Sequence, residues 1–303
     1  MKKWLLALLA LSLTLSLAAC NEPPAESESE SLSESVSETE SETETESETE
    51  SETEKEREPV DVYEAFEQKV LEYGDGYTLP YRIYVPDDYS AEKSYPVLVF
   101  LHGAGERGDD NTAQLLHVIP ELFADVNSPA YDAIGVCPQC PTGMQWVDTP
   151  WAEGSYDLSE TPISIPMQGV MELLDLVQSE YSTDMDRFYA MGISMGGFGT
   201  WDLCMRNPDF FAAAAPICGG ADPTEADALV NLPIYTVHGD ADGSVPVTGT
   251  REIVAAIRAE GGEKIHYEEM PGYPHNVWKY AATEARVDGK PLVEWLFDQV
   301  YGN

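Results

Sequence analysis

Gly192-Ile193-Ser194-Met195-Gly196-Gly197 is the stretch that decides the fold of this chain. It directly follows the apolar run Arg187–Met191 and precedes a helix-like segment. A Gly-x-Ser-x-Gly between a strand and a helix lifts the serine hydroxyl above the sheet edge, because its glycines let the backbone cross itself without a Cβ clash. This context predicts that Ser194 is a nucleophile. A five-residue match also arises by chance, so the prediction depends on partners elsewhere in the chain.

The sequence around this stretch alternates apolar, β-branched or aromatic runs with helix-like segments. Several runs are almost continuously apolar, as expected for strands of a parallel sheet that helices cover on both faces. We therefore expect an α/β domain with an open, mostly parallel central sheet. The expected strands are Tyr81–Val85, Val97–Leu101, Ala133–Val136, Arg187–Met191, Ala212–Ile217, Ile234–Val237 and Lys264–Glu268.

Three amphipathic helices are expected between and after these strands. The first opens at Pro166, the second covers Arg251–Ala259 before the stop signal Gly261-Gly262, and the third is Leu292–Val300. The apolar faces that the 3.6-residue spacing predicts are Val170, Leu173, Leu174 and Val177 in the first helix and Ile253, Val254 and Ile257 in the second.

Sites on such sheets lie at the carboxyl ends of the strands, so each partner of the serine is expected directly after a strand. The glycine-rich loop His102–Gly108 follows the second expected strand. We expect this loop to point a backbone N–H, that of Ala104 or of its neighbour Gly103, at a developing oxyanion. The N–H of Met195 is the expected second donor. His102 precedes the turn and is expected to brace the loop.

The loop His238–Pro246 follows another expected strand and contains two candidate acids. Asp240 follows the strand at once and is expected to fasten the turn, whereas the Asp242 carboxylate can reach across the cleft. His275 lies on a turn after the last expected strand. The order Ser194, Asp242, His275 is the chain order of the catalytic triad in hydrolases built on this type of sheet.

These motifs together resemble the α/β-hydrolase fold, in the esterase group that includes feruloyl and acetyl xylan esterases, dienelactone hydrolases and polyhydroxybutyrate depolymerase-like enzymes. The resemblance covers about residues 75 to 301. It is carried by Leu101-His102-Gly103-Ala104-Gly105-Glu106-Arg107-Gly108-Asp109-Asp110-Asn111, by Cys137-Pro138-Gln139-Cys140-Pro141, by Gly192–Gly197 through Trp201, by His238-Gly239 with Asp242 and Val245-Pro246, and by His275 with Trp278.

The resemblance implies a serine carboxylesterase with a Ser194–His275–Asp242 triad and an acyl-enzyme intermediate. In the family, the acid falls in His-Gly-x-x-Asp-x-x-Val-Pro, which favours Asp242 over Asp240. No cofactor is implied, and no His, Asp and Cys cluster has the spacing of a metal site. His117 and His266 are interpreted as core or surface residues, and His238 as a residue that fastens the acid loop.

The connections between strands bear on the substrate. Only fifteen residues separate Ile217 from the next strand, which leaves no room for a cap domain and predicts an open site. The longer connection from Pro141 to Ile165 carries aromatic residues that are expected either to rim the cleft or to cover the sheet edge. The candidate substrate-binding residues are Trp146, Trp151 and Trp278, with Tyr156 in the same connection as Trp146 and Trp151.

An open, aromatic-rimmed site suggests esters of large molecules, such as acyl or feruloyl esters of plant polysaccharide fragments. Two alternatives stay open. One is a peptidase resembling the prolyl oligopeptidase group, although those enzymes usually carry a propeller domain, which does not precede residue 75 here. The other is a non-catalytic binding lipoprotein, against which the intact triad argues. The oligomeric state is left open.

The N-terminus predicts export. Lys2 and Lys3 precede the apolar run Trp4–Ala19, as in a secretory signal, and Leu17-Ala18-Ala19-Cys20 resembles the bacterial lipobox. We expect residues 1–19 to be a signal peptide and Cys20 to be lipidated, which tethers the protein to a membrane outside the cytoplasm. The alternative is an uncleaved anchor helix, for which the run is short.

Residues 20–58 are expected to form a disordered acidic stalk, because sixteen Glu and almost no apolar residues cannot bury enough surface to order the chain. A specific calcium-binding tract is the less favoured alternative. Residues 59–303 are then the catalytic domain. They carry 39 acidic and 12 basic side chains, which argues against nucleic acid as a partner.

Four cysteines lie in this domain: Cys137, Cys140, Cys204 and Cys218. In an oxidising compartment some of them can pair, and the sequence leaves the pairing open. Cys137-Pro138-Gln139-Cys140 is interpreted as structural, because no second pair has zinc-finger spacing and no thioredoxin-like pattern surrounds it.

Overall fold

The computed structural model describes residues 57–302, and the core of this region is one eight-stranded sheet with the order β1-β2-β4-β3-β5-β6-β7-β8. The pairs β1–β2 and β2–β4 are antiparallel, and the other neighbours are parallel. The strands are β1 (Glu67–Tyr73), β2 (Tyr77–Tyr84), β3 (Tyr95–Leu101), β4 (Ile134–Pro138), β5 (Thr183–Ile193), β6 (Ala213–Ile217), β7 (Ile234–Gly239) and β8 (Ile265–Met270).

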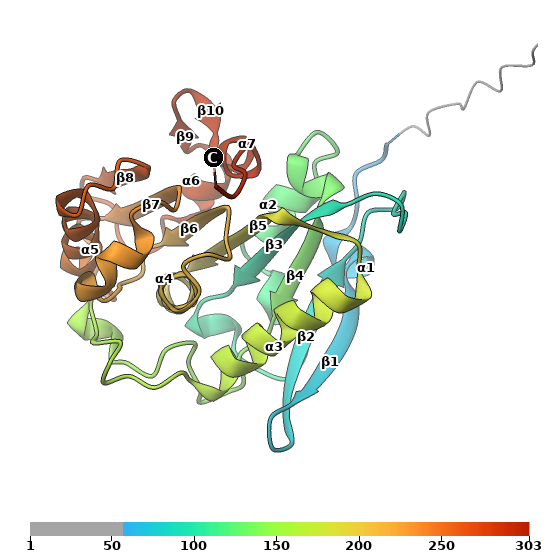
Figure 1. The fold of residues 1–303 in the computed structure, drawn as a ribbon, viewed down its shortest axis with the longest axis horizontal. Helices are drawn as coiled ribbons and strands as arrows, with labels where there is room; N and C mark the ends of the chain where they lie inside the picture. The colour runs from blue at the N-terminus through green and yellow to red at the C-terminus, as the bar shows by residue number, and fades with distance from the viewer. Residues whose placement is uncertain (1–56, 303) are drawn as a thin grey trace, which may run out of the picture. The chain divides into compact units, whose positions relative to one another are not determined.

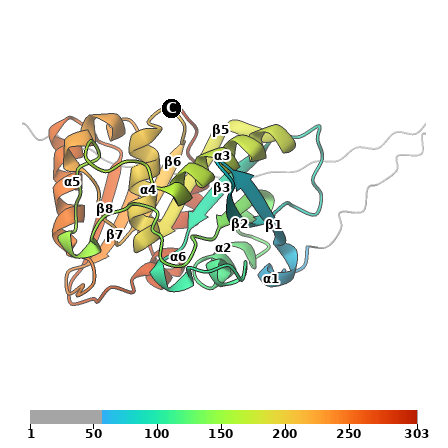
Figure 2. The ribbon, with the colours of Figure 1, turned by 90° about the horizontal axis from the view of Figure 1, so that it is seen from below.

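Helices cover both faces of the sheet (Figures 1 and 2). One face carries α3 (Ile165–Glu180), α4 (Met195–Arg206) and α5 (Val247–Ala259), and Figure 2 shows these three side by side. On the other side lie α1 (Val62–Ala65), α2 (Ile119–Phe123), α6 (Trp278–Thr283) and α7 (Leu292–Phe297). Short 3-10 turns join the elements, at Ala104–Glu106 (η1), Ala113–Leu115 (η2), Pro129–Asp132 (η3), Trp151–Glu153 (η4) and Pro223–Leu229 (η5), and β9 (Arg286–Val287) pairs with β10 (Lys290–Pro291).

The side chains of β3 show why the sheet is buried on both faces. Val97, Val99 and Leu101 belong to the core beneath α3 and α4, whereas Leu98 and Phe100 belong to the core on the opposite face. All five are fully buried. Because successive side chains of a strand point to opposite faces, a continuously apolar strand requires a cover on each side.

The predicted fold class is confirmed: the sheet is mostly parallel, helices lie on both faces, and β6 and β7 are joined by η5 with no inserted domain. Each predicted strand is present, some with longer bounds, and the apolar faces predicted for α3 and α5 are buried. The segment Leu292–Val300 is helical only to Phe297.

Strand β1 was not predicted. It pairs only with β2, at the edge of the sheet, and most of its side chains are exposed or half-buried. An edge strand with a largely solvated surface does not carry the apolar run by which buried strands are recognised. Among residues 57–302, no helix has both the length and the apolar character that a membrane crossing requires.

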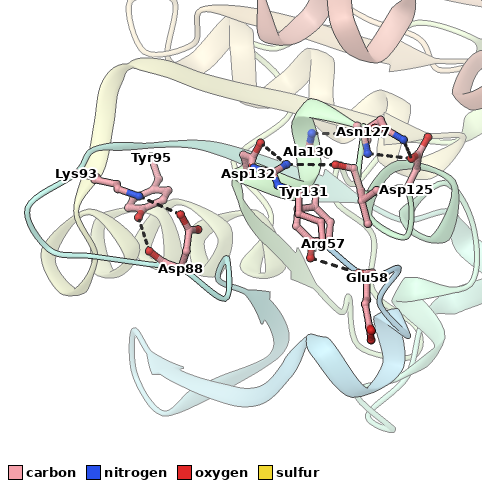
Figure 3. Close-up of polar contacts among 12 residues, drawn as sticks. Arg57, Glu58, Asp88, Lys93, Tyr95, Asp125, Asn127, Ala130, Tyr131 and Asp132 are labelled. Carbon is pink, nitrogen blue, oxygen red and sulfur yellow. Dashed lines mark hydrogen bonds and ion pairs between the residues drawn. The ribbon is translucent and has the colours of Figure 1, made fainter. Parts of the chain in front are cut away.

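Two edges of the sheet matter below. The carboxyl edge is where the parallel strands end, and the amino edge is where they begin. At the amino edge, the first described residues contact the domain (Figure 3). Arg57 forms an ion pair with Asp132 at 2.8 Å, and the Tyr131 hydroxyl donates a hydrogen bond to the Glu58 carbonyl. Residues 1–56, with the predicted signal peptide, Cys20 and most of the stalk, lie outside the described residues.

Candidate active site

Ser194 stands on a sharp turn between β5 and α4. Its backbone has φ 55° and ψ −118°, a conformation that non-glycine residues adopt rarely. The Ser194 N–H donates to the Ile217 carbonyl at 2.9 Å, which ties the turn to the end of β6. A Cβ on Gly196 would lie 1.8 Å from the Leu101 carbonyl oxygen, so this position accepts only glycine. The predicted strand–turn–helix context of the motif is therefore present.

The structure brings the three predicted triad residues together. His275 Nε2 lies 2.7 Å from Ser194 Oγ, and His275 Nδ1 lies 2.6 Å from Asp242 Oδ2. A carboxylate only accepts hydrogen bonds, so Nδ1 carries the proton that it donates to Asp242. That assignment leaves Nε2 as the acceptor for the serine hydroxyl. This is the geometry that a serine nucleophile, a general base and an orienting acid require.

The Asp242 side chain is fully buried, and four groups donate hydrogen bonds to its carboxylate. Oδ1 accepts from the backbone N–H of Ser244 and of Val245, at 2.8 and 2.9 Å. Oδ2 accepts from His275 and also from His238 Nε2 at 3.0 Å. Burial opposes ionisation, but the hydrogen bonds outweigh it and hold the Asp242 pKa well below its usual range. Asp242 is therefore an anion with a fixed orientation.

Asp240, the competing acid, lies outside this network. Its carboxylate accepts from the Gly272 N–H at 2.5 Å and so joins the β7 loop to the β8 turn. The sequence interpretation of Asp240 as the fastener and Asp242 as the orienting acid matches these contacts.

The predicted oxyanion donors stand at the starts of two helical segments. Ala104 is the first residue of η1, and Met195 is the first residue of α4. The N–H groups of a first helical residue have no partner within the helix, so both are free to bind an anion. A Cβ placed on the neighbouring Gly103 would lie 3.7 Å from the Ser194 Cβ. The loop after β3 is thus in contact with the candidate nucleophile.

His102 braces this loop, as expected. Its Nε2 accepts from the Cys140 N–H at 2.9 Å, so its Nδ1 is the protonated nitrogen that donates to the Gly103 carbonyl at 2.6 Å. Burial lowers the pKa of His102 to about 4, so the ring is neutral at physiological pH.

The prediction that Trp146 binds substrate is wrong. Trp146 is 0% exposed, and its Nε1 donates to the His102 carbonyl at 3.0 Å. Its ring also packs edge-on against the His102 ring. Trp146 therefore supports the oxyanion loop from below, where a substrate does not reach it.

Trp151 and Trp278 are half-buried. The Arg107 guanidinium lies 5.6 Å from the centre of the Trp151 ring, and Arg107 Nε donates to the Ala104 carbonyl. Trp151 therefore stands beside the oxyanion loop. The Trp278 ring lies 5.6 Å from the His275 ring. Trp151 thus neighbours the oxyanion loop, whereas Trp278 neighbours the candidate base.

The connection that carries Trp151 crosses the carboxyl edge. A Cβ on Gly220 or on Gly249 would lie 1.7 Å from the Gly154 carbonyl oxygen, so this connection touches the loop after β6 and the start of α5. Tyr156 is buried, and its hydroxyl donates to Asp202 at 3.0 Å, so it anchors the connection to α4. Of the two expectations for this connection, Trp151 fits the rim and Tyr156 fits the cover of the sheet.

Sequence reasoning did not single out Glu106 or His117. Glu106 lies in the glycine-rich loop that was interpreted only for its backbone, and His117 contacts both Glu106 and Trp278. For Glu106, the signal in the sequence was a charged residue within a glycine-rich loop, at a position that the fold buries. His238, expected to fasten the acid loop, does so by bonding Asp242 and the Val245 carbonyl.

The four domain cysteines are buried and unpaired. Burial raises the pKa of the Cys140 thiol to about 12 and also raises the pKa of Cys137, so neither is a thiolate at neutral pH. Within residues 57–302, no group of three or more His, Cys, Asp or Glu residues is placed to hold a metal ion.

Comparisons with known proteins agree with this geometry. The family described as "Putative esterase" matches residues 76–278. A bifunctional acetylxylan esterase/xylanase of Neocallimastix patriciarum is 29% identical over 160 residues, which are 53% of this chain and 21% of that protein. Feruloyl esterase B of Thermothelomyces thermophilus is 30% identical over 183 residues, 58% of this chain and 56% of the relative.

A crystal structure of a thermostable esterase superposes with a TM-score of 0.69 at 31% identity, covering 79% of this chain and 64% of that one. The chain thus spans between a fifth and about two thirds of the length of these proteins. Fold and site define the class of α/β-hydrolases. Within that class, the chain belongs to the esterase family.

Proposed function

We propose that this protein is a serine carboxylesterase in which Ser194 is the nucleophile, His275 the general base and Asp242 the orienting acid. The observation that carries the proposal is the unbroken connection from Ser194 Oγ through His275 to the buried Asp242, at 2.7 and 2.6 Å. The esterase family and the names of the relatives support ester bonds as the target.

The mechanism follows from the contacts. Ser194 Oγ attacks the ester carbonyl carbon while His275 Nε2 takes the hydroxyl proton, and Asp242 stabilises the imidazolium that forms. The N–H groups of Met195 and of Ala104 or Gly103 bind the oxyanion of the tetrahedral intermediate. His275 then gives its proton to the leaving alcohol, and water releases the acid from the acyl-enzyme with the same base.

The substrate proposal is an acyl or feruloyl ester of a plant polysaccharide fragment. The relatives named as acetylxylan and feruloyl esterases support it. The short β6–β7 connection leaves the carboxyl edge uncapped, which suits a large substrate. Half-buried Trp151, with Arg107 over its ring, offers a flat surface for an aryl acyl group.

A fluorophosphonate probe tests the nucleophile directly, because it reacts with activated serines. We expect stoichiometric labelling of the wild type and none of Ser194→Ala. Labelling of Ser194→Ala at the wild-type level, or no labelling of a folded wild type, contradicts the proposal. The second outcome would favour a non-catalytic binding protein.

A substrate panel then tests the bond. We expect p-nitrophenyl esters, methyl ferulate and acetylated xylan to be hydrolysed and proline peptides to remain intact. Faster cleavage of the peptides than of the esters would instead assign the protein to the prolyl oligopeptidase-like peptidases.

For the N-terminal region, we propose a lipid anchor on Cys20 that holds the domain outside the cytoplasm, with residues 21–58 as a spacer. The lipobox-like Leu17-Ala18-Ala19-Cys20 supports this. In a bacterial host, labelled palmitate should be incorporated into the wild type and not into Cys20→Ala. Equal incorporation into both, or none into either, would contradict the anchor.

A further inference from the structure

A closed ring of contacts lies beside the candidate nucleophile. It runs from Ser194 through one wall of the site and returns to the oxyanion loop. Its members come from five separate segments of the chain: the β3 loop, the turn after η2, the start of α4, the β8 loop and α6. They are Ser194, His275, Trp278, His117, Glu106 and Gly103.

Each step of the ring is a short distance. Beyond the serine–histidine hydrogen bond, the Trp278 ring lies 5.6 Å from the His275 ring and 5.6 Å from the His117 ring. His117 Nε2 lies 3.6 Å from Glu106 Oε1. A Cβ on Gly103 would lie 3.0 Å from Glu106 Oε2 and 3.7 Å from the Ser194 Cβ, which closes the ring.

Glu106 is the unusual member, because its charged side chain is largely buried. The side chain is 10% exposed, and its contact with His117 Nε2, at 3.6 Å, is longer than a hydrogen bond. The fully enclosed polar atoms that lack a partner among the described residues are on Gln114, Trp151 and Trp201. The Glu106 oxygens are not among them, and the Glu106 side chain keeps a tenth of its surface exposed.

A carboxylate in such a place favours a ligand that donates hydrogen bonds. Burying a charge without donors is costly, whereas a charge-assisted hydrogen bond is about twice as strong as a neutral one. The apolar face of Trp278 stands on the same wall, two contacts away. Carboxylate acceptors beside an aromatic face fit a molecule with hydroxyls on its rim and C–H groups on its face, which describes a sugar.

The position within the reaction decides which part of the substrate lies there. His275 Nε2 protonates the leaving oxygen, so the alcohol portion departs beside His275. Trp278 packs against that ring. The wall formed by Trp278, His117 and Glu106 therefore borders the alcohol.

We propose that Glu106, with His117 and Trp278, forms a binding subsite for a hydroxyl-bearing alcohol portion of the ester, and that the Glu106 carboxylate accepts a hydrogen bond from a sugar hydroxyl. Glu106 acts in binding and takes no part in bond cleavage. The inference rests on the proposed esterase function and specifies its substrate class.

The test compares two esters of one acid: a feruloylated monosaccharide and methyl ferulate, with the corresponding acetyl esters as a second pair. Glu106→Gln keeps the shape of the side chain and removes its charge. We expect kcat/KM for the sugar ester to fall about tenfold, mainly through KM, and kcat/KM for the methyl ester to change by about twofold or less.

Two further variants separate binding from folding. His117→Phe keeps the ring contact with Trp278 and removes the nitrogen beside Glu106, so we expect a smaller loss confined to the sugar ester. Glu121→Gln removes the charge of an exposed α2 side chain outside the ring and should leave kcat/KM for both esters unchanged. Unchanged thermal unfolding of Glu106→Gln shows that the loss is not structural.

The failures are distinguishable. A wild type that hydrolyses neither ester overturns the proposed function itself. A wild type that hydrolyses both, with a Glu106→Gln variant that loses the two activities equally or neither, overturns the subsite alone. A loss that follows the acyl group rather than the alcohol also overturns it.

Discussion

The two edges of the sheet both gather charged residues but use them differently. At the amino edge, a cavity of about 630 Å³ is lined by Arg57, Lys93, Arg187 and Lys290, and each of them is paired with an aspartate. Figure 3 shows two of these pairs, which lie at the surface. In the pair of Arg57 with Asp132, each side chain is about half exposed.

The carboxyl edge holds its key charge in the opposite way. Asp242 is fully buried, receives four hydrogen bonds, and passes its orientation to His275 and so to Ser194. Exposed ion pairs gain little, because water screens them and the long side chains lose freedom. Neither the volume of a cavity nor the number of charges that line it therefore identifies the candidate active site. A buried charge with a fixed orientation, next to a candidate nucleophile, does.

The strongest test of this difference between the two edges is to remove one charge at each of them. Asp242→Asn leaves the size of the side chain almost unchanged but favours the wrong imidazole tautomer, so kcat for p-nitrophenyl acetate should fall by about 10⁴-fold. Asp132→Asn, the matched change at the amino edge, should leave kcat within about twofold. Comparable losses in the two variants would mean that burial and orientation are not what separates the edges.

The next test concerns the backbone at the carboxyl edge, at the turn between β5 and α4. In Gly196→Ala the added carbon meets the Leu101 carbonyl at 1.8 Å, so the elbow must open, and the free energy of unfolding should fall by about 4 kcal/mol or more. Gly105→Ala is the control, because a Cβ there has no neighbour within 4 Å. Chemical denaturation checks both, and equal stability of the two variants would contradict a tight crossing at the elbow.

Measuring the stability of the protein against pH tests the role of His102, which braces the loop after β3. The His102 pKa is depressed from 6.5 to about 4, so the unfolded chain binds a proton that the folded one excludes between these values. Stability contributed by neutral His102 is therefore lost as pH falls through this window, by about 2 kcal/mol between pH 7 and pH 5. His102→Gln should show a correspondingly shallower pH dependence in urea unfolding, and an unchanged slope would refute the assignment.

The smallest effect is expected at the amino edge. A double-mutant cycle of Arg57→Ala and Asp132→Ala should give a coupling free energy of about 0.5 kcal/mol, reduced further by salt, because both side chains are half exposed. Esterase turnover should be unchanged in all three variants. A coupling of several kcal/mol would show that this edge is also pre-organised.

Much of the fold and most of the candidate site followed from the sequence. The buried parallel strands could be predicted because they carry continuous apolar runs. Each loop motif directly follows a strand, so Ser194, Asp242 and His275 could be predicted to lie at the same edge of the sheet. Strand β1 could not, because an edge strand lacks that pattern. Trp146 was misplaced because aromatic side chains serve equally as core and as rim, and spacing does not distinguish them.

The sequence by itself determined the class of chemistry: a serine between glycines at a strand–helix turn, with an acid and a histidine after later strands, has few other uses. Only the tertiary structure decided that Trp146 lies beneath the loop and that Glu106 lies beside Gly103, close to Ser194. These facts depend on contacts between segments far apart in the chain. A local pattern records which residues follow a strand, but the packing of the loops sets which side chains face each other.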